Sequence, residues 1–409
     1  MRRAHIVIAG AGYAGLAAYL ALRPRLDGGA IDLTLVSATD AHLLLPELPL
    51  YLAGQESEHE IRLQLGHVVR PPARLHRARI LRVRSDPPAL VIQGAVDPWV
   101  ADGLVVALGS VPDDFGVKGV REHATLIGRW DDARDLRRRL LATLASRHGG
   151  RVAIVGGGFT GVEIAAELAD THRVPGRIVL IAPHLLADLP ERVGQTARSA
   201  LERLGVELVL GDRAAEVRAD AVVLAGGRRI PCAATIWAAG VRANPVMTDS
   251  HLAVNRRGQA EVDATLRLAP RVYVCGDCAA VTDARTGRPV APTAQAALQQ
   301  GPAAAANLLR ELAGKEPQPL QTRSLGFLIS LGREEAVGSI LGHSVAGGDV
   351  AALKRLIETY HAFQVGGLHA LGARLLRSTG ARRGRASDPE VAAHAQGESP
   401  MPVDPAPQT

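Results

Sequence analysis

Short apolar runs that end in glycine-rich turns set the pattern of this chain. The run 6–9 precedes Gly10, Gly12 and Gly15, a helical spacing follows, and a second apolar run covers 31–36. A short uninterrupted apolar run is typical of a buried strand, and a 3.6-residue period is typical of an amphipathic helix. The pattern therefore predicts a β-α-β unit at the start of the chain.

The same pattern returns 146 positions later, counted from Gly10 to Gly156. Here the run 152–155 precedes Gly156, Gly158 and Gly161. In G-x-G-x-x-G the first glycine permits a tight turn, the second lets the backbone approach a pyrophosphate, and the third lets helix and strand pack closely. The helix N-terminus then offers unpaired N–H groups to the phosphates. Two such motifs, each between a strand and a helix, predict two dinucleotide sites.

The rest of the chain continues this α/β pattern. Buried strands that end in tight turns are expected within 102–112, 234–245 and 271–281, helices within 293–312 and 350–377, and a β-like stretch within 326–340. The expected fold class is α/β, with two Rossmann-like domains, one inserted in the other, and a short C-terminal amphipathic segment. Residues 381–409 lack a periodic apolar face and are expected to be disordered.

Length and composition narrow the class of protein. A chain of 409 residues suggests two or three domains, and a hydrophobic content of 47% suffices for a large core. No apolar run is long enough for a transmembrane helix, and the N-terminus lacks the features of a signal peptide. We expect a cytoplasmic protein that contacts, at most, the cytoplasmic face of the cell membrane.

Charge and cysteine content add two expectations. Between Lys354 and Arg385 seven basic residues face one acid, Glu358, so this segment carries the whole net charge of +6. A basic surface there favours an anionic partner such as a membrane surface, with a solvated face as the alternative; a nucleic-acid partner is not expected. The three cysteines are too few for a disulfide framework.

Two dinucleotide sites in one chain suggest a flavin in one and a nicotinamide in the other. Apart from its tail, the chain resembles the two-dinucleotide-domain flavoprotein oxidoreductases, and most closely the type II NADH dehydrogenases, which pass electrons from NADH to a quinone. The segments that carry the resemblance are AHLLLPELPLYLAG (41–54), VVALGSVPDDFGVKGVREHA (105–124), GGGFTGVEIAAEL (156–168), CGDCAAV (275–281), APTAQAALQQG (291–301) and LGFLISLGREEAVGSI (325–340).

The resemblance implies FAD at the first motif and NADH at the second. The residues it assigns to FAD are Gly10, Ala11, Gly12, Tyr13, Ala14, Gly15, Ser37, Ala107, Gly109, Gly276, Asp277 and Ala294. Those it assigns to the nicotinamide cofactor are Gly156, Gly158, Phe159, Thr160, Gly161, Ala239 and Gly240. It also implies a division into FAD domain (1–110 and 263–325), NADH domain (111–262) and a C-terminal segment (326–380) on the quinone side.

Three residues are expected to act in catalysis. Glu163 lies near the start of the helix that follows the second glycine motif, where the helix dipole also favours a carboxylate. The resemblance places it beside the nicotinamide. Gln295 and Gln299 lie four apart on one helix face, and their amides are suited to the two carbonyls of a neutral quinone. The expected reaction needs no metal and pumps no protons.

Some features depart from the family pattern. The second strand of a Rossmann unit usually ends in an acid that binds a ribose hydroxyl, but Ser37 and Ala182 stand there, with Asp40 as a substitute in the first unit. NADH is therefore preferred only as a hypothesis, and NADPH stays open. The C-terminal stripe of Leu353, Leu356, Ile357 and Tyr360, continued by Leu368, Leu371 and Leu375, fits weak peripheral membrane association, docking on the protein's own core, or a homodimer contact.

The rival classes differ in their cysteines and acceptors. Residues 16–231 contain no cysteine, and none follows Cys278, which argues against a dithiol-disulfide reductase and a sulfide:quinone oxidoreductase. Cys275 and Cys278 are expected to be small buried residues. An NAD(P)H:ferredoxin-type or other FAD-dependent pyridine nucleotide oxidoreductase remains an alternative, as does a non-enzymatic flavin redox sensor.

Overall fold

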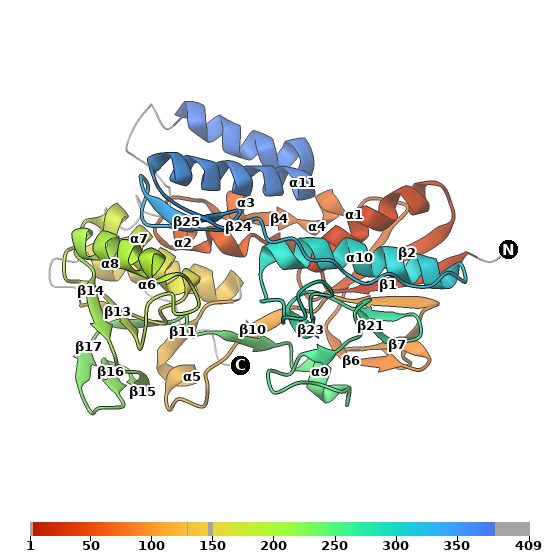
Figure 1. Ribbon diagram of the computed structural model, residues 1–409, viewed down its shortest axis with the longest axis horizontal. Helices are drawn as coiled ribbons and strands as arrows, with labels where there is room; N and C mark the ends of the chain where they lie inside the picture. Colours follow the sequence, from red (N-terminus) through yellow and green to blue (C-terminus); the bar gives the residue numbers. More distant parts are fainter. Residues whose placement is uncertain (1–2, 129, 146–149, 381–409) are drawn as a thin grey trace, which may run out of the picture.

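The computed structural model describes residues 3–128, 130–145 and 150–380. The predicted tail, 381–409, lies outside the described residues, as do the side chains of Leu368, Leu371 and Leu375. Two sheets, one mainly and one wholly parallel, form the body of the molecule, and they lie side by side in Figure 1. The expected α/β fold with two Rossmann-like units is confirmed.

The first sheet gathers strands from both ends of the chain. In spatial order it contains β21 (Arg267–Ala269), β22 (Val272–Val274), β9 (Gly103–Val106), β1 (Ala4–Ala9), β2 (Ile31–Ser37) and β5 (Arg74–Arg77). All neighbours pair in parallel except β21 and β22. The run 6–9 pairs with both neighbouring strands and is fully buried, as its uninterrupted apolar sequence predicts.

Two helices and an antiparallel sheet flank this first sheet. Figure 1 shows α1 (Tyr13–Asp27) and α10 (Ala294–Leu312) above the strands, with β6 (Ile80–Ser85) and β7 (Pro88–Ile92) below. β7 also pairs with β8 (Trp99–Val100). Gly301 lets the helices α1 and α10 pack closely, since a Cβ at this position would lie only 2.1 Å from the carbonyl oxygen of Ala14.

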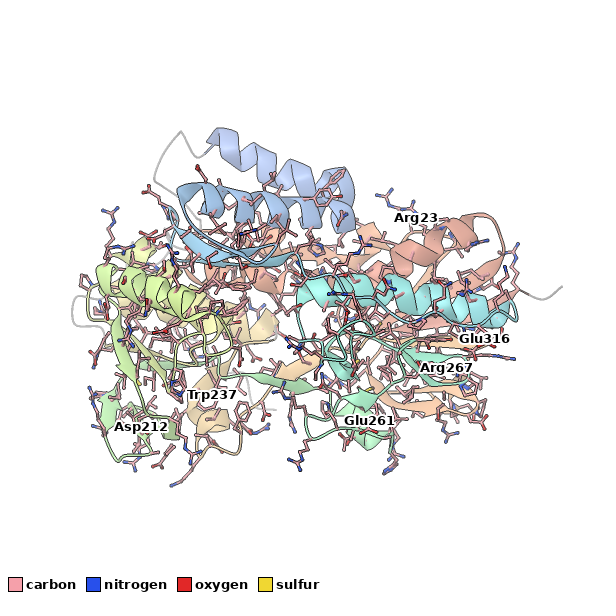
Figure 2. All side chains as sticks on the ribbon, viewed as in Figure 1. Arg23, Asp212, Trp237, Glu261, Arg267 and Glu316 are labelled. Atoms are coloured by element: carbon pink, nitrogen blue, oxygen red, sulfur yellow. The ribbon has the colours of Figure 1, made fainter. Side chains whose placement is uncertain are left out.

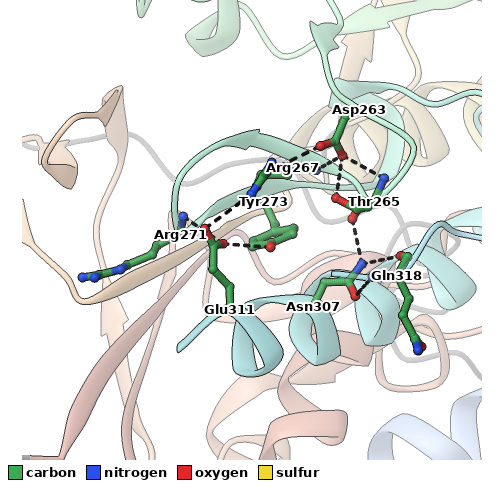
Figure 3. A network of polar contacts seen from close by, with 8 residues as sticks. All are labelled: Asp263, Thr265, Arg267, Arg271, Tyr273, Asn307, Glu311 and Gln318. Atoms are coloured by element: carbon green, nitrogen blue, oxygen red, sulfur yellow. Dashed lines mark hydrogen bonds and ion pairs between the residues drawn. The ribbon is translucent and has the colours of Figure 1, made fainter. Parts of the chain in front are cut away.

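A polar network anchors the C-terminal end of α10 to β21 and β22 (Figure 3). The hydroxyl of the buried Tyr273 donates to Glu311 Oε2 at 2.8 Å. The amide nitrogen of Asn307 donates to the carbonyl oxygens of Thr265, at 2.9 Å, and Gln318, at 2.8 Å. These contacts fix the axis of α10 and hence the direction in which its N-terminal turns project.

The second sheet comes from the middle of the chain and is wholly parallel. Its strands are β11 (Ala124–Leu126), β18 (Ala234–Trp237), β12 (Val152–Val155), β13 (Ile178–Ala182) and β14 (Glu207–Leu210). The helices of this unit are α5 (Val120–His123), α6 (Trp130–Ala145), α7 (Phe159–His172) and α8 (Glu191–Arg203). Its antiparallel sheet comprises β15 (Ala214–Arg218), β16 (Ala221–Leu224) and β17 (Arg229–Pro231). Figure 2 shows Trp237 in this unit and Arg267 in the other.

Short elements join the two units. The strands β10 (Ser110–Pro112) and β19 (Val241–Ala243) form an antiparallel pair where the chain passes between the sheets. The remaining short strands are β3 (Ala41–Leu43) with β4 (Arg62–Gln64), and β20 (Ala260–Glu261) with β23 (Ala279–Ala280). The remaining short helices are η1 (Leu45–Glu47), α2 (Leu48–Leu52), α3 (Glu58–Ile61), α4 (Leu65–Val68), α9 (Val246–Asp249) and η2 (Gly276–Cys278).

The C-terminal segment covers one side of both units. It contains the meander β24 (Gly326–Ser330), β25 (Ala336–Ile340) and β26 (His343–Gly347), followed by α11 (Gly348–Gly380). Figure 1 shows α11 across the top, above α2 and α3. The apolar stripe of α11 faces outward, since Leu356, Ile357 and Tyr360 are 53–64% exposed.

Candidate active site

The first glycine turn has the geometry of a phosphate cradle. A Cβ on Gly10 would lie 2.3 Å from the carbonyl oxygen of Ala107, and one on Gly15 would lie 1.9 Å from that of Gly10. A Cβ on Gly12 would meet nothing within 4 Å. Gly12 is also the N-cap residue of α1, and as a glycine it has no side chain that could bond the N–H groups of the first turn. The space and the N–H groups at this helix start are therefore available to an anionic ligand.

The second glycine turn repeats this geometry. A Cβ on Gly156 would lie 2.2 Å from the carbonyl oxygen of Ala238, and one on Gly161 would lie 1.9 Å from that of Gly156, whereas Gly158 again has open space. Phe159 and Thr160, which follow it, are exposed. The counterpart of Ala107 is thus Ala238, a residue that the sequence analysis passed over in favour of its neighbours Ala239 and Gly240.

The second motif expected at FAD lies against the first turn. A Cβ on Gly276 would lie 3.1 Å from Cβ of Ala14. Burial raises the pKa of Asp277, and its Oδ2 accepts a hydrogen bond from Ser110 Oγ at 2.7 Å. The N–H of Gly276 donates to Oε1 of the buried Gln300 at 2.7 Å. Sequence reasoning missed Ser110 and Gln300, although each is adjacent to a residue that it named.

The acids that usually end the second strands are absent from both units. Ser37 is buried, and its Oγ accepts a hydrogen bond from the N–H of Thr39 at 3.2 Å. Asp40, the expected substitute, is bonded instead to Arg62 Nη2 at 2.6 Å. Ala182 is buried at the end of β13. Neither strand end therefore offers a free carboxylate to a ribose.

Glu163 joins the second turn to the C-terminal segment. It is 7% exposed, and its Oε1 accepts a hydrogen bond from the N–H of Ser330 at 3.0 Å. Lys354 Nζ lies 2.8 Å from this same oxygen, 2.9 Å from Glu358 Oε1 and 2.9 Å from Ser330 Oγ. Burial opposes the charge on Lys354, but the two carboxylates raise its pKa above the ordinary value. Lys354 therefore stays protonated over the physiological range.

This ion pair places one of the expected basic residues inside the protein. Lys354 was expected among the seven basic residues of the C-terminal segment, with Glu358 as the one acid facing them. Lys354 is only 9% exposed and pairs with Glu358 inside the protein. The i, i+4 spacing of these two residues was the signal that an internal pair was present.

The two glutamines of the expected quinone site differ in their contacts. Gln299 Nε2 donates to the carbonyl oxygens of Gln295, at 3.2 Å, and Arg323, at 3.0 Å, while its Oε1 accepts from the N–H of Arg323 at 2.9 Å. Gln295 uses Oε1 to accept from the N–H of Leu325 at 3.3 Å. Among the described residues Gln295 Nε2 has no hydrogen-bond acceptor, so only Gln295 has an amide donor available. Ala294 begins α10 beside it.

Aromatic and imidazole rings bring α11 to the first turn as well. The Tyr13 ring stacks on His361 with ring centroids 4.7 Å apart, and His42 lies edge-on to Tyr13 at the same distance. Burial, together with the nearby His361, lowers the pKa of His42 to about 3. The helix α11 therefore contacts the helices that follow both glycine turns, through His361 at Tyr13 and through Lys354 at Glu163.

No cluster of metal-binding side chains occurs in the described part of the chain. Cys275 and Cys278 are buried and unbonded to each other, and burial raises the pKa of both thiols, that of Cys278 to about 11. They line the strand end beneath Asp277 as neutral small side chains.

Comparison with known proteins agrees with this geometry. The family model "Pyridine nucleotide-disulphide oxidoreductase" matches residues 4–301. A type II NADH:quinone oxidoreductase of Staphylococcus aureus (strain NCTC 8325 / PS 47) is 29% identical over 392 residues, which cover 90% of this chain and 97% of that protein. The expected resemblance to type II NADH dehydrogenases is confirmed by such relatives.

Solved structures share the fold at low identity. NDH2 from Plasmodium falciparum in complex with NADH superposes with a TM-score of 0.79 at 16% identity, covering 93% of this chain and 98% of that one. The sulfide:quinone oxidoreductase of Aquifex aeolicus superposes with a TM-score of 0.74 at 18% identity, covering 89% and 91%. Since the family model spans both glycine turns and the Gly276–Asp277 motif, the chain belongs to the pyridine nucleotide-disulphide oxidoreductase family.

Proposed function

We propose that this protein is an FAD-dependent NADH:quinone oxidoreductase that does not pump protons. The observation that carries the proposal is the pair of open glycine turns, at Gly12 and Gly158. The helices that follow them both contact the same C-terminal helix. The relatives that are named NADH:quinone oxidoreductases support it over nearly the whole chain.

The first turn fits FAD. The open space at Gly12 suits a pyrophosphate, and the carboxyl of Asp277, held by Ser110, suits a polyol hydroxyl. When bound, FAD would supply a carrier that takes two electrons as hydride and releases them to an acceptor. The second turn would hold NADH in the same way, with its pyrophosphate at the start of α7.

The residues around these turns would position the reactants. Lys354 and Ser330 hold the Glu163 carboxylate in one orientation, which suits a hydrogen bond to the nicotinamide carboxamide. Gln295 would donate its available N–H to a quinone carbonyl. Gln299 would act indirectly, since its amide holds the backbone of Arg323 and so the wall beside Gln295.

The division of the chain is part of the proposal. Residues 1–110 and 263–325 would bind FAD, 111–262 would bind NADH, and 326–380 would cover the quinone side. In support, β21 and β22 join the first sheet, while β11 to β18 build the second unit.

Peripheral association with a membrane completes the proposal. No helix within the described ranges combines the length and apolarity required to cross a bilayer. The outward stripe of α11, with Leu356 and Ile357 more than half exposed, suits shallow insertion at the cytoplasmic face.

Two measurements test the proposed function. The flavin released from the purified protein should be FAD at about one per chain, and NADH oxidation should require a short-chain quinone. Activity with ferredoxin but not with quinone would favour the reductase alternative, and a bound flavin that NADH does not reduce would favour a sensor.

A further inference from the structure

A second buried glutamate lies one helical turn beyond Glu163. Glu167 is 1% exposed, and its Oε2 accepts a hydrogen bond from Gln55 Nε2 at 2.6 Å. Residues four apart on a helix lie on one face, with about 5–6 Å between their Cβ atoms. Glu167 therefore shares the interior of the cluster with Glu163 and Lys354, although neither of these bonds it directly.

The charges in this cluster do not balance if every carboxyl group is ionised. Lys354 contacts two carboxylates directly, those of Glu163 and Glu358. The partner of Glu167 is the neutral amide of Gln55. An unpaired carboxylate in the protein interior costs several kcal/mol, so the group without a cation takes up a proton instead.

The surroundings of Glu167 support this assignment. Burial raises its pKa to about 7, with Glu163 and Asp170 acting in the same direction, while the Gln55 hydrogen bond and Lys354 oppose the rise. Arg333 approaches only indirectly, through Nε to Gln55 Oε1 at 3.2 Å. A group with this pKa exchanges a proton readily near neutral pH.

The proposed reaction consumes one such proton. NADH supplies a hydride, quinone becomes quinol, and the balance NADH + H⁺ + quinone → NAD⁺ + quinol requires one proton from water. We propose that Glu167 stores this proton and delivers it through the Glu163–Lys354 pair to the acceptor. The O–H bond on Glu167 breaks, an O–H bond forms on the quinol, and solvent reprotonates Glu167 past Gln55 and the exposed Arg333.

This inference rests on the proposed function, and Glu167 acts through Glu163 rather than on the substrate. The test compares two acceptors in stopped-flow reoxidation of the NADH-reduced protein. A short-chain quinone takes up electrons and protons, whereas ferricyanide takes up electrons alone. Glu167→Gln should slow reoxidation by quinone at least about tenfold below pH 7, while reoxidation by ferricyanide and reduction by NADH stay within about twofold of wild type.

The pH profile separates a proton store from a structural role. In the wild type the rate with quinone should fall as pH rises through about 7, where Glu167 loses its proton, and Glu167→Gln should abolish this inflection. Gln55→Ala keeps the carboxyl group but removes the bond that favours its ionised form, so the inflection should move to higher pH. Asp170→Asn, on the same helix, removes a charge that raises this pKa, so its inflection should persist and move to lower pH.

A readout independent of turnover completes the test. The infrared band of protonated carboxyl groups, titrated between about pH 5 and pH 9, should contain a component that is missing in Glu167→Gln. Suppose that the wild type reduces quinone but that Glu167→Gln and Gln55→Ala both keep its pH profile. That result overturns the role of Glu167 as a proton store and leaves the proposed function standing. A wild type that NADH reduces but quinone does not reoxidise overturns the proposed function as well.

Discussion

Lys354 Nζ lies 2.8 Å from Oε1 of Glu163, and both side chains are buried. The contact joins α11 to the helix that follows the second glycine turn. Breaking a buried ion pair by removing one partner leaves an uncompensated charge and costs about 3–5 kcal/mol. The pair is therefore both a structural tie and a part of the proposed site.

Lys354→Met should lower the free energy of unfolding by about 3 kcal/mol, because it removes the cation that contacts both Glu163 and Glu358. Urea denaturation followed by circular dichroism measures this change. Adding Glu163→Gln should cost less than the sum of the single variants, by about 1–3 kcal/mol. Additive costs would show that the two side chains do not interact in solution.

Stability should depend on pH through Glu167. Folding raises the pKa of this group from 4.5 to about 7, so the folded protein holds a proton that the unfolded chain has lost. The stability gained from this proton is complete below pH 4.5 and declines as pH rises to about 7. Relative to Glu167→Gln, the wild type should lose about 3 kcal/mol across this window. Parallel stability curves for the two proteins would contradict the raised pKa.

The glycines of the first turn should separate folding from cofactor binding. The methyl group of Gly12→Ala would point into open space, so this variant should fold normally. Its FAD content should fall about tenfold or more. Gly15→Ala would place a Cβ 1.9 Å from the backbone of Gly10 and should fail to fold stably. Gly158→Ala is the matched variant of the second turn and should keep FAD while weakening NADH binding. Full FAD content in Gly12→Ala would place the cofactor elsewhere.

Much of this arrangement was predictable because it depends on local patterns. Buried strands followed by glycines located β1, β12 and both turns to within a few residues. The contact of Lys354 with Glu163 and that of Gln55 with Glu167 were not predictable, because each joins residues more than 100 positions apart. Gln299 shows the same limit: its spacing from Gln295 was correct for one helix face, yet the carbonyl oxygens of Gln295 and Arg323 accept its two N–H groups.

The two glutamines should behave differently when shortened. Gln295→Ala removes the available amide donor and should slow quinone reduction about tenfold while leaving reduction by NADH unchanged. Gln299→Ala releases the backbone at Arg323, so it should also lower thermal stability. Stopped-flow traces and melting curves of both variants decide the matter, and equal loss in both half-reactions for Gln295→Ala would count against its assigned role.

The outward face of α11 should govern membrane binding. Aspartate at both Leu356 and Ile357 should weaken binding to anionic vesicles at least about tenfold, because each exposed side chain would otherwise bury apolar area in the bilayer. Cosedimentation measures this binding. Val96→Asp is the matched control, because Val96 is fully exposed and lies between β7 and β8, away from α11 in the sequence. Equal binding of both variants would assign the stripe another role.

Anaerobic stopped-flow of the two half-reactions tests the central claim most directly. The purified protein is mixed with NADH while the visible flavin band is followed, and a short-chain quinone is then added. The proposed function predicts fast bleaching by NADH and fast recovery with quinone. Bleaching that recovers with ferredoxin but not with quinone, or a flavin that NADH does not bleach, would contradict it.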